Sequence, residues 1–154
     1  MMTTIEIVDA TDADREWAAR VMAASEPWIS LGRGLEACRQ TCCRPDLSAF
    51  VARQKTGPLG FILLHPKGVA GSPYIASIGV APGARGRGIG QRLVAFVENL
   101  VADDARYIFL CVSSFNPRAQ AFYERLGYTA VGELKDYVVD GASEILMHKR
   151  LRRS

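Results

Sequence analysis

Residues 77–98, SIGVAPGARGRGIGQRLVAFVE, decide how this chain folds, because they combine an apolar strand, a glycine-rich loop and an amphipathic helix. The apolar run around Ile78 and Val80 stops at Ala81-Pro82-Gly83, which predicts a strand that ends in a turn. From Gly88 onward, apolar residues recur with the spacing of a half-buried helix, at Ile89, Leu93, Phe96, Val97 and Leu100. The stretch therefore predicts a strand, a loop and a helix in direct succession.

The loop Arg85-Gly86-Arg87-Gly88-Ile89-Gly90 is chemically suited to a phosphate group. Its glycines let the backbone approach a ligand closely, and the first N–H groups of the following helix have no partner within that helix. The dinucleotide fingerprint G-x-G-x-x-G fails because Gln91 and Leu93 occupy the sixth positions, and no Gly-Lys-Ser/Thr ending of a P-loop is present. The loop predicts an anion site. The alternatives are an ordinary turn with solvated arginines, or a nucleotide-binding α/β protein with a coincidental loop.

Length and composition limit the classes of protein that fit. The 154 residues predict a single domain over residues 1–154, which buries roughly two-thirds of its unfolded surface. The net charge is only +3, and no basic face with interleaved aromatic residues is evident, so we expect no nucleic-acid partner. No apolar run approaches the ~18 residues of a membrane span, and no signal-peptide core is evident. We therefore expect no membrane partner and a cytoplasmic location.

The cysteine pattern argues against a metal site. Cys38-x-x-x-Cys42-Cys43 has no second pair of ligands nearby, and both histidines, His65 and His148, are distant in sequence. We therefore expect no bound metal and free structural thiols, with Cys43 exposed to oxidation.

The predicted elements follow the order β-α-α-β-β-β-α-β-α-β-β, which is typical of one layered α/β domain. Asp12 or Asp14 is expected to cap the first helix. Proline and glycine predict a turn over residues 65–73, and Asp140-Gly141 predicts a hairpin between the last two strands. The basic tail over residues 148–153 is expected to be solvated.

A second motif follows the fifth predicted strand, Asn116-x-x-Ala119-x-x-Phe122-Tyr123-x-x-x-Gly127-Tyr128. Asn116 suits the N-cap of a helix, Pro117 its first turn and Gly127 the position after its end. Together with Arg85-x-x-Gly88-x-Gly90, this motif resembles the GNAT superfamily of acyl-CoA-dependent N-acyltransferases. The match extends from Tyr74 to about Gly132. The layout is similar to that of ribosomal-protein alanine acetyltransferases.

The resemblance implies a fold and a cofactor. The fold would be a GNAT-like α/β (α+β) domain, whose mixed, mostly antiparallel sheet of six to seven strands is flanked by about four helices and splayed at the acyl-CoA site. Acetyl-CoA would be the co-substrate. Its pantetheine arm and pyrophosphate would be held by three groups of residues: the strand end Ile78, Gly79 and Val80, the loop Arg85, Gly86, Arg87, Gly88, Ile89, Gly90 and Gln91, and the helix cap Asn116.

The resemblance also implies an activity, the transfer of an acetyl group from acetyl-CoA to a primary amine by direct attack in a ternary complex. Tyr123 would be the catalytic general acid, because a tyrosine with a pKa near ~10 stays protonated at neutral pH and can donate to a thiolate leaving group. Two alternatives stay open. In the first, Tyr123 is a half-buried core residue without a catalytic role. In the second, the chain is a non-catalytic acyl-CoA-binding sensor or regulatory module.

The general base is not evident from the sequence. Ribosomal-protein alanine acetyltransferases carry a glutamate on the fifth strand, where this chain has Cys111. A base matters because a lysine-type amine is neutral in only about one molecule in 2,500 at pH 7, whereas an α-amino group costs only about 1 kcal/mol to deprotonate. Glu133, Asp136 and a water held near Ser113 are the candidate substitutes.

The acceptor is expected to be a small-molecule or peptide amine. The resemblance places the acceptor cleft beside the loop over residues 28–33 and the last hairpin, so Trp28 and Tyr137 are candidate aromatic walls and Arg33 a candidate partner for an acidic group. Local packing of these loop residues is an equal alternative. Homodimer formation, which is common among relatives, is a further expectation.

Overall fold

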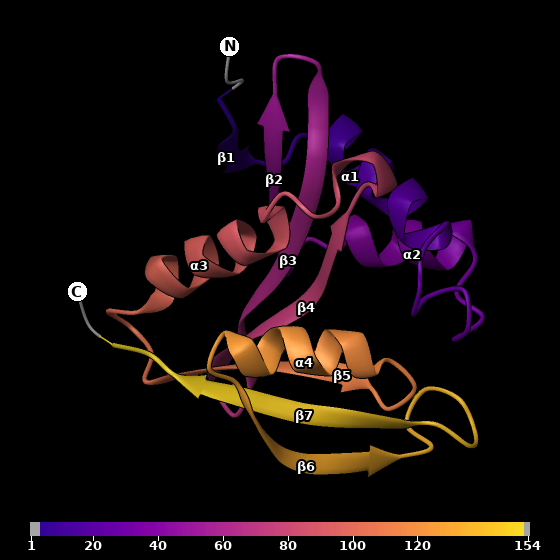
Figure 1. Cartoon of the computed structure of the whole chain (residues 1–154), viewed down its shortest axis with the longest axis vertical. Helices are drawn as coiled ribbons and strands as arrows, with labels where there is room; N and C mark the ends of the chain where they lie inside the picture. Colours follow the sequence, from indigo (N-terminus) through magenta and orange to yellow (C-terminus); the bar gives the residue numbers. More distant parts are fainter. Residues whose placement is uncertain (1–3, 153–154) are drawn as a thin grey trace.

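Seven strands form one sheet in the order β1-β2-β3-β4-β5-β7-β6 in the computed structural model, which describes residues 4–152 (Figure 1). The strands are β1 (Glu6–Asp9), β2 (Ser48–Gln54), β3 (Gly57–Val69), β4 (Ser72–Val80), β5 (Tyr107–Ser113), β6 (Thr129–Lys135) and β7 (Ser143–Arg150). The helices are α1 (Asp12–Ala23), α2 (Leu35–Cys42), α3 (Ile89–Val101) and α4 (Pro117–Arg125), with a short 3-10 turn, η1 (Pro82–Ala84). Within residues 4–152, no helix is long and apolar enough to span a membrane.

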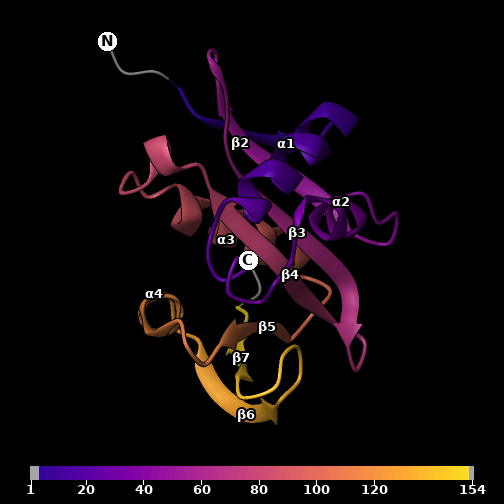
Figure 2. The ribbon, with the colours of Figure 1, turned by 90° about the vertical axis from the view of Figure 1, so that its right-hand side faces the viewer.

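The sheet is mixed because β4 and β5 run parallel, whereas every other neighbouring pair of strands is antiparallel. β4 and β5 pair only at Tyr74 with Phe109 and at Ile75 with Leu110, near the start of both strands. Beyond Ile75 the two strands diverge, and β5, β7 and β6 turn away from the rest of the sheet (Figure 2). The predicted mixed sheet, splayed at one pair of strands, is confirmed.

Two apolar layers cover the two faces of the sheet. Figure 2 shows α1 and α2 on one side and α3 and α4 on the other. The layer under α3 and α4 includes Leu93, Leu110 and Tyr123, and the layer under α1 and α2 includes Met22 and Phe61. The apolar stripe predicted for α3 is confirmed at Ile89, Leu93 and Val97, which are at most 2% exposed, and Phe96 is half-buried. The prediction is wrong at Leu100, which is 52% exposed because the buried face turns toward Val94 instead.

The predicted cap of α1 is wrong by one residue or more. Thr11 is the N-cap, and its hydroxyl accepts a hydrogen bond from the Asp14 N–H at 3.1 Å. The Asp14 carboxylate accepts in turn from the Thr11 N–H at 3.0 Å, which completes a capping box. Asp14 also pairs with Arg53 of β2 at 3.1 Å. The aspartate therefore fastens the start of the helix to the sheet instead of capping it alone.

The turn predicted over residues 65–73 is much shorter in the structure. β3 continues to Val69, and β4 starts at Ser72. Only Ala70 and Gly71 connect them, with φ of 49° and 84°. Positive φ at both central residues is the geometry of a two-residue hairpin turn that matches the strand twist. His65 pairs with Tyr74 and Val69 with Ser72, so pairing on both sides keeps the chain in β3, while residues 66–68 form an irregularity between these two pairs.

The expectation of a solvated basic tail is also wrong. Residues 148–150 belong to β7, which lies between β5 and β6 and pairs with both. The Lys149 ammonium donates to the Glu98 carboxylate at 3.0 Å, and Tyr128 donates to the same carboxylate at 2.7 Å. Lys149 thus packs its hydrocarbon stem in the structure while its charge reaches Glu98, and Arg150 lies over the Tyr107 ring, 5.9 Å from its centroid. Residues 148–150 are therefore part of a central strand in the C-terminal part of the sheet, Leu151 after them is buried, Arg152 is exposed, and residue 153 lies outside the described residues.

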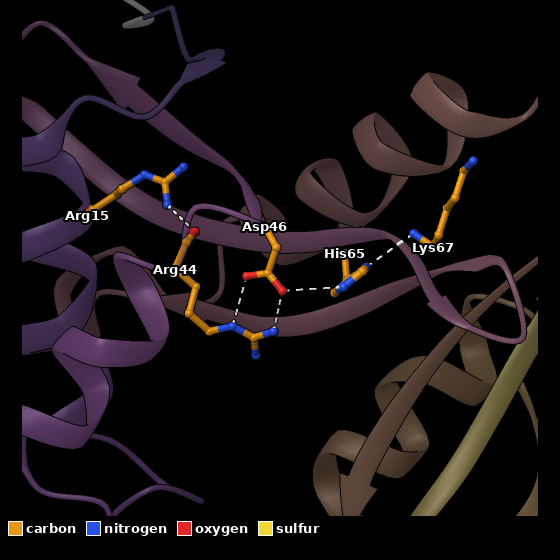
Figure 3. A network of polar contacts seen from close by, with 5 residues as sticks. All are labelled: Arg15, Arg44, Asp46, His65 and Lys67. Carbon is orange, nitrogen blue, oxygen red and sulfur yellow. Dashed lines mark hydrogen bonds and ion pairs between the residues drawn. The ribbon is translucent and has the colours of Figure 1, made fainter.

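A polar network joins the N-terminal helices to β3 (Figure 3). Arg15 of α1 donates to the Cys42 and Arg44 carbonyls at 2.9 and 3.2 Å, which fixes the chain after α2. Arg44 pairs with Asp46, whose carboxylate lies 3.5 Å from His65 Nε2 on β3. These contacts hold the α1–α2 layer in place over the sheet.

All four cysteines are free, at Cys38, Cys42, Cys43 and Cys111. Cys38 and Cys42 are buried on α2, as their spacing predicts, and Cys43 is exposed. Within residues 4–152, no three His, Cys, Asp or Glu side chains gather where they could hold a metal ion.

Thiol alkylation should separate Cys43 sharply from Cys42. Burial raises the pKa of the Cys42 thiol to about 12, so at pH 8 it remains protonated, and only a thiolate attacks iodoacetamide. We expect Cys43 to be alkylated first, as followed by mass spectrometry of proteolytic peptides. Unfolding in urea should remove the difference, and equal rates in the native protein would contradict the burial of α2.

Candidate active site

The opening between β4 and β5 lies beside the first motif. The far part of β4 keeps its antiparallel pairing with β3, where Ile78 lies opposite Ile62 and Val80 opposite Gly60. Its other edge has lost β5, so backbone groups there face the opening. Ile78, Gly79 and Val80, the residues predicted to contact a pantetheine arm, are all half-buried along this segment. The position suits a ligand that takes the place of a strand.

The loop after β4 leads directly into α3. Gly86 and Gly88 adopt left-handed φ values of 79° and 75°, which favour glycine. The first α-helical hydrogen bond runs from the Arg92 N–H to the Gly88 carbonyl at 3.1 Å. The amides of Ile89, Gly90 and Gln91 therefore precede the helical ladder and present the positive end of a 13-residue helix. This is the arrangement that binds phosphate at helix N-termini.

The glycines of the site serve different purposes. A Cβ atom added at Gly86 or Gly88 would meet no atom within 4 Å, so open space faces the loop there. At Gly90 an added Cβ would lie 3.3 Å from the Phe122 ring, and at Gly79 only 2.5 Å from the Phe61 ring. The first pair allows a ligand to approach, whereas Gly90 and Gly79 allow α4 and the core to pack closely.

Both arginines of the loop are exposed and only weakly engaged. Arg85 donates from Nε to the Val80 carbonyl at 3.4 Å, and Arg87 donates to the Gln54 side chain at 3.5 Å. Contacts this long and exposed contribute little to stability. The two guanidinium groups are therefore free to turn toward an anion bound at the loop.

Asn116 caps α4. Its Oδ1 accepts a hydrogen bond from the Ala119 N–H at 3.3 Å, and its own N–H donates to the Ser113 carbonyl at 2.9 Å. Because Oδ1 accepts, the side-chain amide NH₂ remains available as a donor. The capping role and the predicted ligand contact are compatible in this geometry.

Tyr123 lies on α4 and is 7% exposed. It belongs to the same apolar layer as Ile75 and Leu110, the residues of β4 and β5 at the point where these strands diverge. Its ring packs against the rings of Phe122 and Tyr128 at 5.1 and 5.8 Å. Burial raises the pKa of Tyr123 above its ordinary value, so the phenol stays protonated. Within residues 4–152 its hydroxyl makes no hydrogen bond, which leaves the proton for a ligand.

The three candidate acceptor residues lie in different surroundings. Trp28 packs beside Phe61, with ring centroids 6.5 Å apart. Arg33 donates to the Thr41 hydroxyl of α2 at 2.9 Å, and Tyr137, between β6 and β7, is 68% exposed. The three side chains thus have different surroundings, and their acceptor role stays a prediction.

Sequence reasoning missed Tyr74. Burial, followed by the neighbouring Cys111 thiol of β5 and the Glu144 carboxylate, raises the pKa of its phenol. Burial also raises the pKa of the Cys111 thiol, and Tyr74 partly opposes that shift. A tyrosine at the start of a strand carries no motif, so the signal in the sequence is too weak to single it out.

The fold and site define a class: a single α/β sheet split between two parallel strands, with a glycine-rich loop and a helix start at one end of the split and a buried phenol in the adjoining layer. The chain belongs to the acetyltransferase (GNAT) family, whose family model matches residues 11–128. The resemblance inferred from the two motifs is therefore confirmed, and the chain is a member of a family of acetyltransferases.

Known proteins of similar sequence and structure agree with this family. A 5-NmdU N-acetyltransferase of Pseudomonas phage PaMx11 is 39% identical over 75 residues, which are 48% of this chain and 51% of that protein. The chain thus spans about half the length of this relative. The structure is similar to an aminoglycoside 6′-N-acetyltransferase complexed with coenzyme A (TM-score 0.78, 19% identity, 97% of this chain and 98% of that chain). It is also similar to the ribosomal-protein-S18-alanine N-acetyltransferase of Escherichia coli (TM-score 0.77, 18% identity, 98% and 96%). At these identities the two structures show a shared fold.

Proposed function

We propose that this chain is an N-acetyltransferase that moves an acetyl group from acetyl-CoA to a primary amine by direct attack in a ternary complex. The observation that carries the proposal is the opening between β4 and β5, with the loop of open-facing glycines at one end and the Tyr123 hydroxyl in the adjoining layer. Coenzyme A thioesters carry a pyrophosphate at one end and a reacting thioester at the other. A site for them therefore needs an anion-binding group and a proton donor at the two ends of one opening.

The residues present fit coenzyme A. The amides of residues 86–91 would hold the pyrophosphate at the start of α3, and Arg85 and Arg87 would add charge-assisted hydrogen bonds. The open edge of β4 at residues 78–80 would bond the amide groups of the pantetheine arm, as a neighbouring strand would. The Asn116 amide would donate to the same arm from the start of α4. Together these contacts direct the thioester into the split.

The chemistry then depends on proton transfer. A neutral amine attacks the thioester carbonyl carbon, and backbone N–H groups at the end of β4 stabilise the charge that develops on the carbonyl oxygen. As the carbon–sulfur bond breaks, Tyr123 donates its proton to the departing thiolate. Because burial raises its pKa, the phenol is protonated at neutral pH and enters the reaction as the hydrogen-bond donor to the developing thiolate.

The acceptor is proposed to be a small-molecule or peptide amine. One relative is named for 5-NmdU and a structural neighbour for an aminoglycoside, which favours small amines of diverse shape. Trp28, Arg33 and Tyr137 remain the proposed acceptor residues, in a single catalytic domain over residues 1–154. A non-catalytic acyl-CoA-binding module is the second candidate, because Cys111 replaces the carboxylate that the similar ribosomal-protein enzymes carry on the fifth strand.

Isothermal titration with acetyl-CoA, ATP and NAD, followed by an amine panel, tests the proposal. We expect saturable binding of acetyl-CoA alone, weakening with salt because the pyrophosphate site is electrostatic. The panel would contain 5-NmdU, an aminoglycoside, lysine and peptides with a free α-amine, with release of the CoA thiol as the readout. Binding without turnover would favour the non-catalytic module, and no binding by the folded protein would overturn the transferase proposal.

A further inference from the structure

The face of β5 and β7 that lies opposite α4 carries polar groups that the proposed mechanism has not used. Along β5, Ile108, Leu110 and Val112 point into the layer under α3 and α4. Residues 109, 111 and 113 therefore point to the other face, toward the side of α1 and α2. Across the antiparallel pair, Cys111 lies opposite Leu146, and Ser113 lies opposite Glu144. Glu144 thus shares its face with Cys111, as a diagonal neighbour on the adjacent strand.

The Glu144 carboxylate is held in position by a buried hydroxyl. Ser113, only 2% exposed, donates from Oγ to Glu144 Oε2 at 2.7 Å. Glu144 itself is half-buried. Because one carboxylate oxygen is engaged, the other can accept a hydrogen bond from a substrate. A buried hydroxyl that positions a half-buried carboxylate is an arrangement suited to proton transfer.

The same carboxylate belongs to the cluster at the split. Its negative charge contributes to the raised pKa of both Tyr74 on β4 and Cys111 on β5, after burial as the main cause. Tyr137, from the segment after β6, also contributes to the raised pKa of Tyr74. Glu144 therefore lies within electrostatic reach of the gap where β4 and β5 part.

The carboxylates considered from sequence are engaged elsewhere. Glu133 lies opposite Ile145, which packs against the layer under α4, so it points to the other face of the sheet. It accepts from the Ser143 hydroxyl at 2.7 Å in an exposed pair. Asp136 accepts from the Gly141 N–H at 2.7 Å and so closes the last turn. Neither is directed at the split.

We propose that Glu144, positioned by Ser113, is the general base for the acceptor amine. This inference rests on the proposed acetyl transfer. The carboxylate takes one proton from the acceptor ammonium and passes it to solvent. The neutral nitrogen forms a bond to the acetyl carbon, the carbon–sulfur bond breaks, and Tyr123 protonates the departing thiolate. The nitrogen loses its second proton to solvent as the amide forms, and a proton from solvent restores the Tyr123 phenol. The carboxylate of Glu144 on β7 thereby serves as the general base, at a site where β5 carries Cys111 instead of a glutamate.

Glu144→Gln tests this role by removing the base and keeping the shape. We expect kcat/KM for the amine to fall about 100-fold or more, with acetyl-CoA binding unchanged by titration. Glu144→Asp should retain part of the rate because it keeps a carboxylate. Glu133→Gln is the matched comparison, since it alters a glutamate with a serine partner at the same distance on the opposite face. Ser113→Ala should lower kcat more than it raises KM, and Ser113→Thr should restore the rate.

The outcomes separate the two proposals. If the wild-type protein transfers acetyl groups and the Glu144→Gln variant is equally active, Glu144 is not the general base, and the proposed transferase activity still stands. Equal losses in the Gln and Asp variants indicate a structural role and also overturn the base. If no panel amine is acetylated, release of the CoA thiol to water is compared in the same variants. Failure of the wild-type protein to bind acetyl-CoA, or to release CoA at all, overturns both.

Alkylation of Cys111 checks the position of Glu144 without any turnover. The carboxylate charge raises the thiol pKa, so Glu144→Gln should lower that pKa and increase the thiolate fraction. We expect faster iodoacetamide labelling of Cys111 in the variant, with exposed Cys43 as an internal reference. An unchanged ratio of the two rates would show that Glu144 does not face this cluster.

Discussion

Replacing Tyr123 with phenylalanine is expected to lower kcat by about 10²–10⁴-fold, which corresponds to roughly 3–5 kcal/mol of transition-state stabilisation. The substitution removes only the hydroxyl, and the ring contacts to Phe122 and Tyr128 remain. Because burial raises the pKa of Tyr123, the phenol stays a donor through the alkaline range, and its ionisation should not cause a loss of rate below about pH 10. Steady-state release of the CoA thiol measures the effect.

Tyr128→Phe is the matched control, because it also removes one buried phenol. The Tyr128 hydroxyl donates to Glu98 at 2.7 Å rather than to a ligand. We expect this variant to lose about 1 kcal/mol of stability and to keep its kcat. If Tyr123→Phe turns over as fast as the wild-type protein, Tyr123 is a core aromatic and another group protonates the thiolate.

Leu93→Ala is expected to destabilise the fold by about 2–5 kcal/mol. Leu93 is fully buried at 0% exposure in the middle of α3, and a Cβ added at Gly60 of β3 would lie only 3.2 Å from its Cδ1. The truncation therefore opens a cavity where the helix meets the sheet. In a chain of this length each kcal/mol lowers Tm by roughly 2–4 °C, so thermal unfolding followed by circular dichroism should detect it clearly.

Leu100→Ala on the same helix provides the comparison. Leu100 is 52% exposed, so its truncation should change stability by less than about 0.5 kcal/mol. Similar losses in both variants would contradict the docking of α3 through the face that carries Leu93. Saturation with acetyl-CoA should raise the Tm of Leu93→Ala, because a ligand bound at the start of α3 stabilises only the folded state.

The sequence predicted correctly those parts of the fold that depend on residues close to one another in the chain. The spacing of Ile89, Leu93 and Val97 predicted the buried face of α3, and the glycines at 86 and 88 predicted a loop that the structure forms with positive φ. Asn116 and Gly127 likewise marked the start and end of α4. Each of these features depends on residues within one or two turns of one another, so the information lies in a short window of the chain.

The wrong predictions concern the cap of α1 and the basic tail, where residues nearby in the chain do not decide the structure. Thr11, Asp12 and Asp14 are all good cap residues, and the partnership of Asp14 with Arg53, 39 positions away, decides between them. The basic tail from residue 148 has no strong pattern of its own. It becomes a strand because β5 and β6 offer it two edges with unpaired backbone groups.

By itself, the sequence determined the family, the position of the glycine-rich loop and the identity of the buried phenol, because a motif fixes side chains relative to their own helix or turn. Only the tertiary structure decided that Glu144 faces Cys111 and that Ser113, 31 positions earlier, holds it. Strand register sets which residues share a face, and a shift of one residue would have turned Glu144 toward α4. That register depends on pairing between distant segments, which no local pattern encodes.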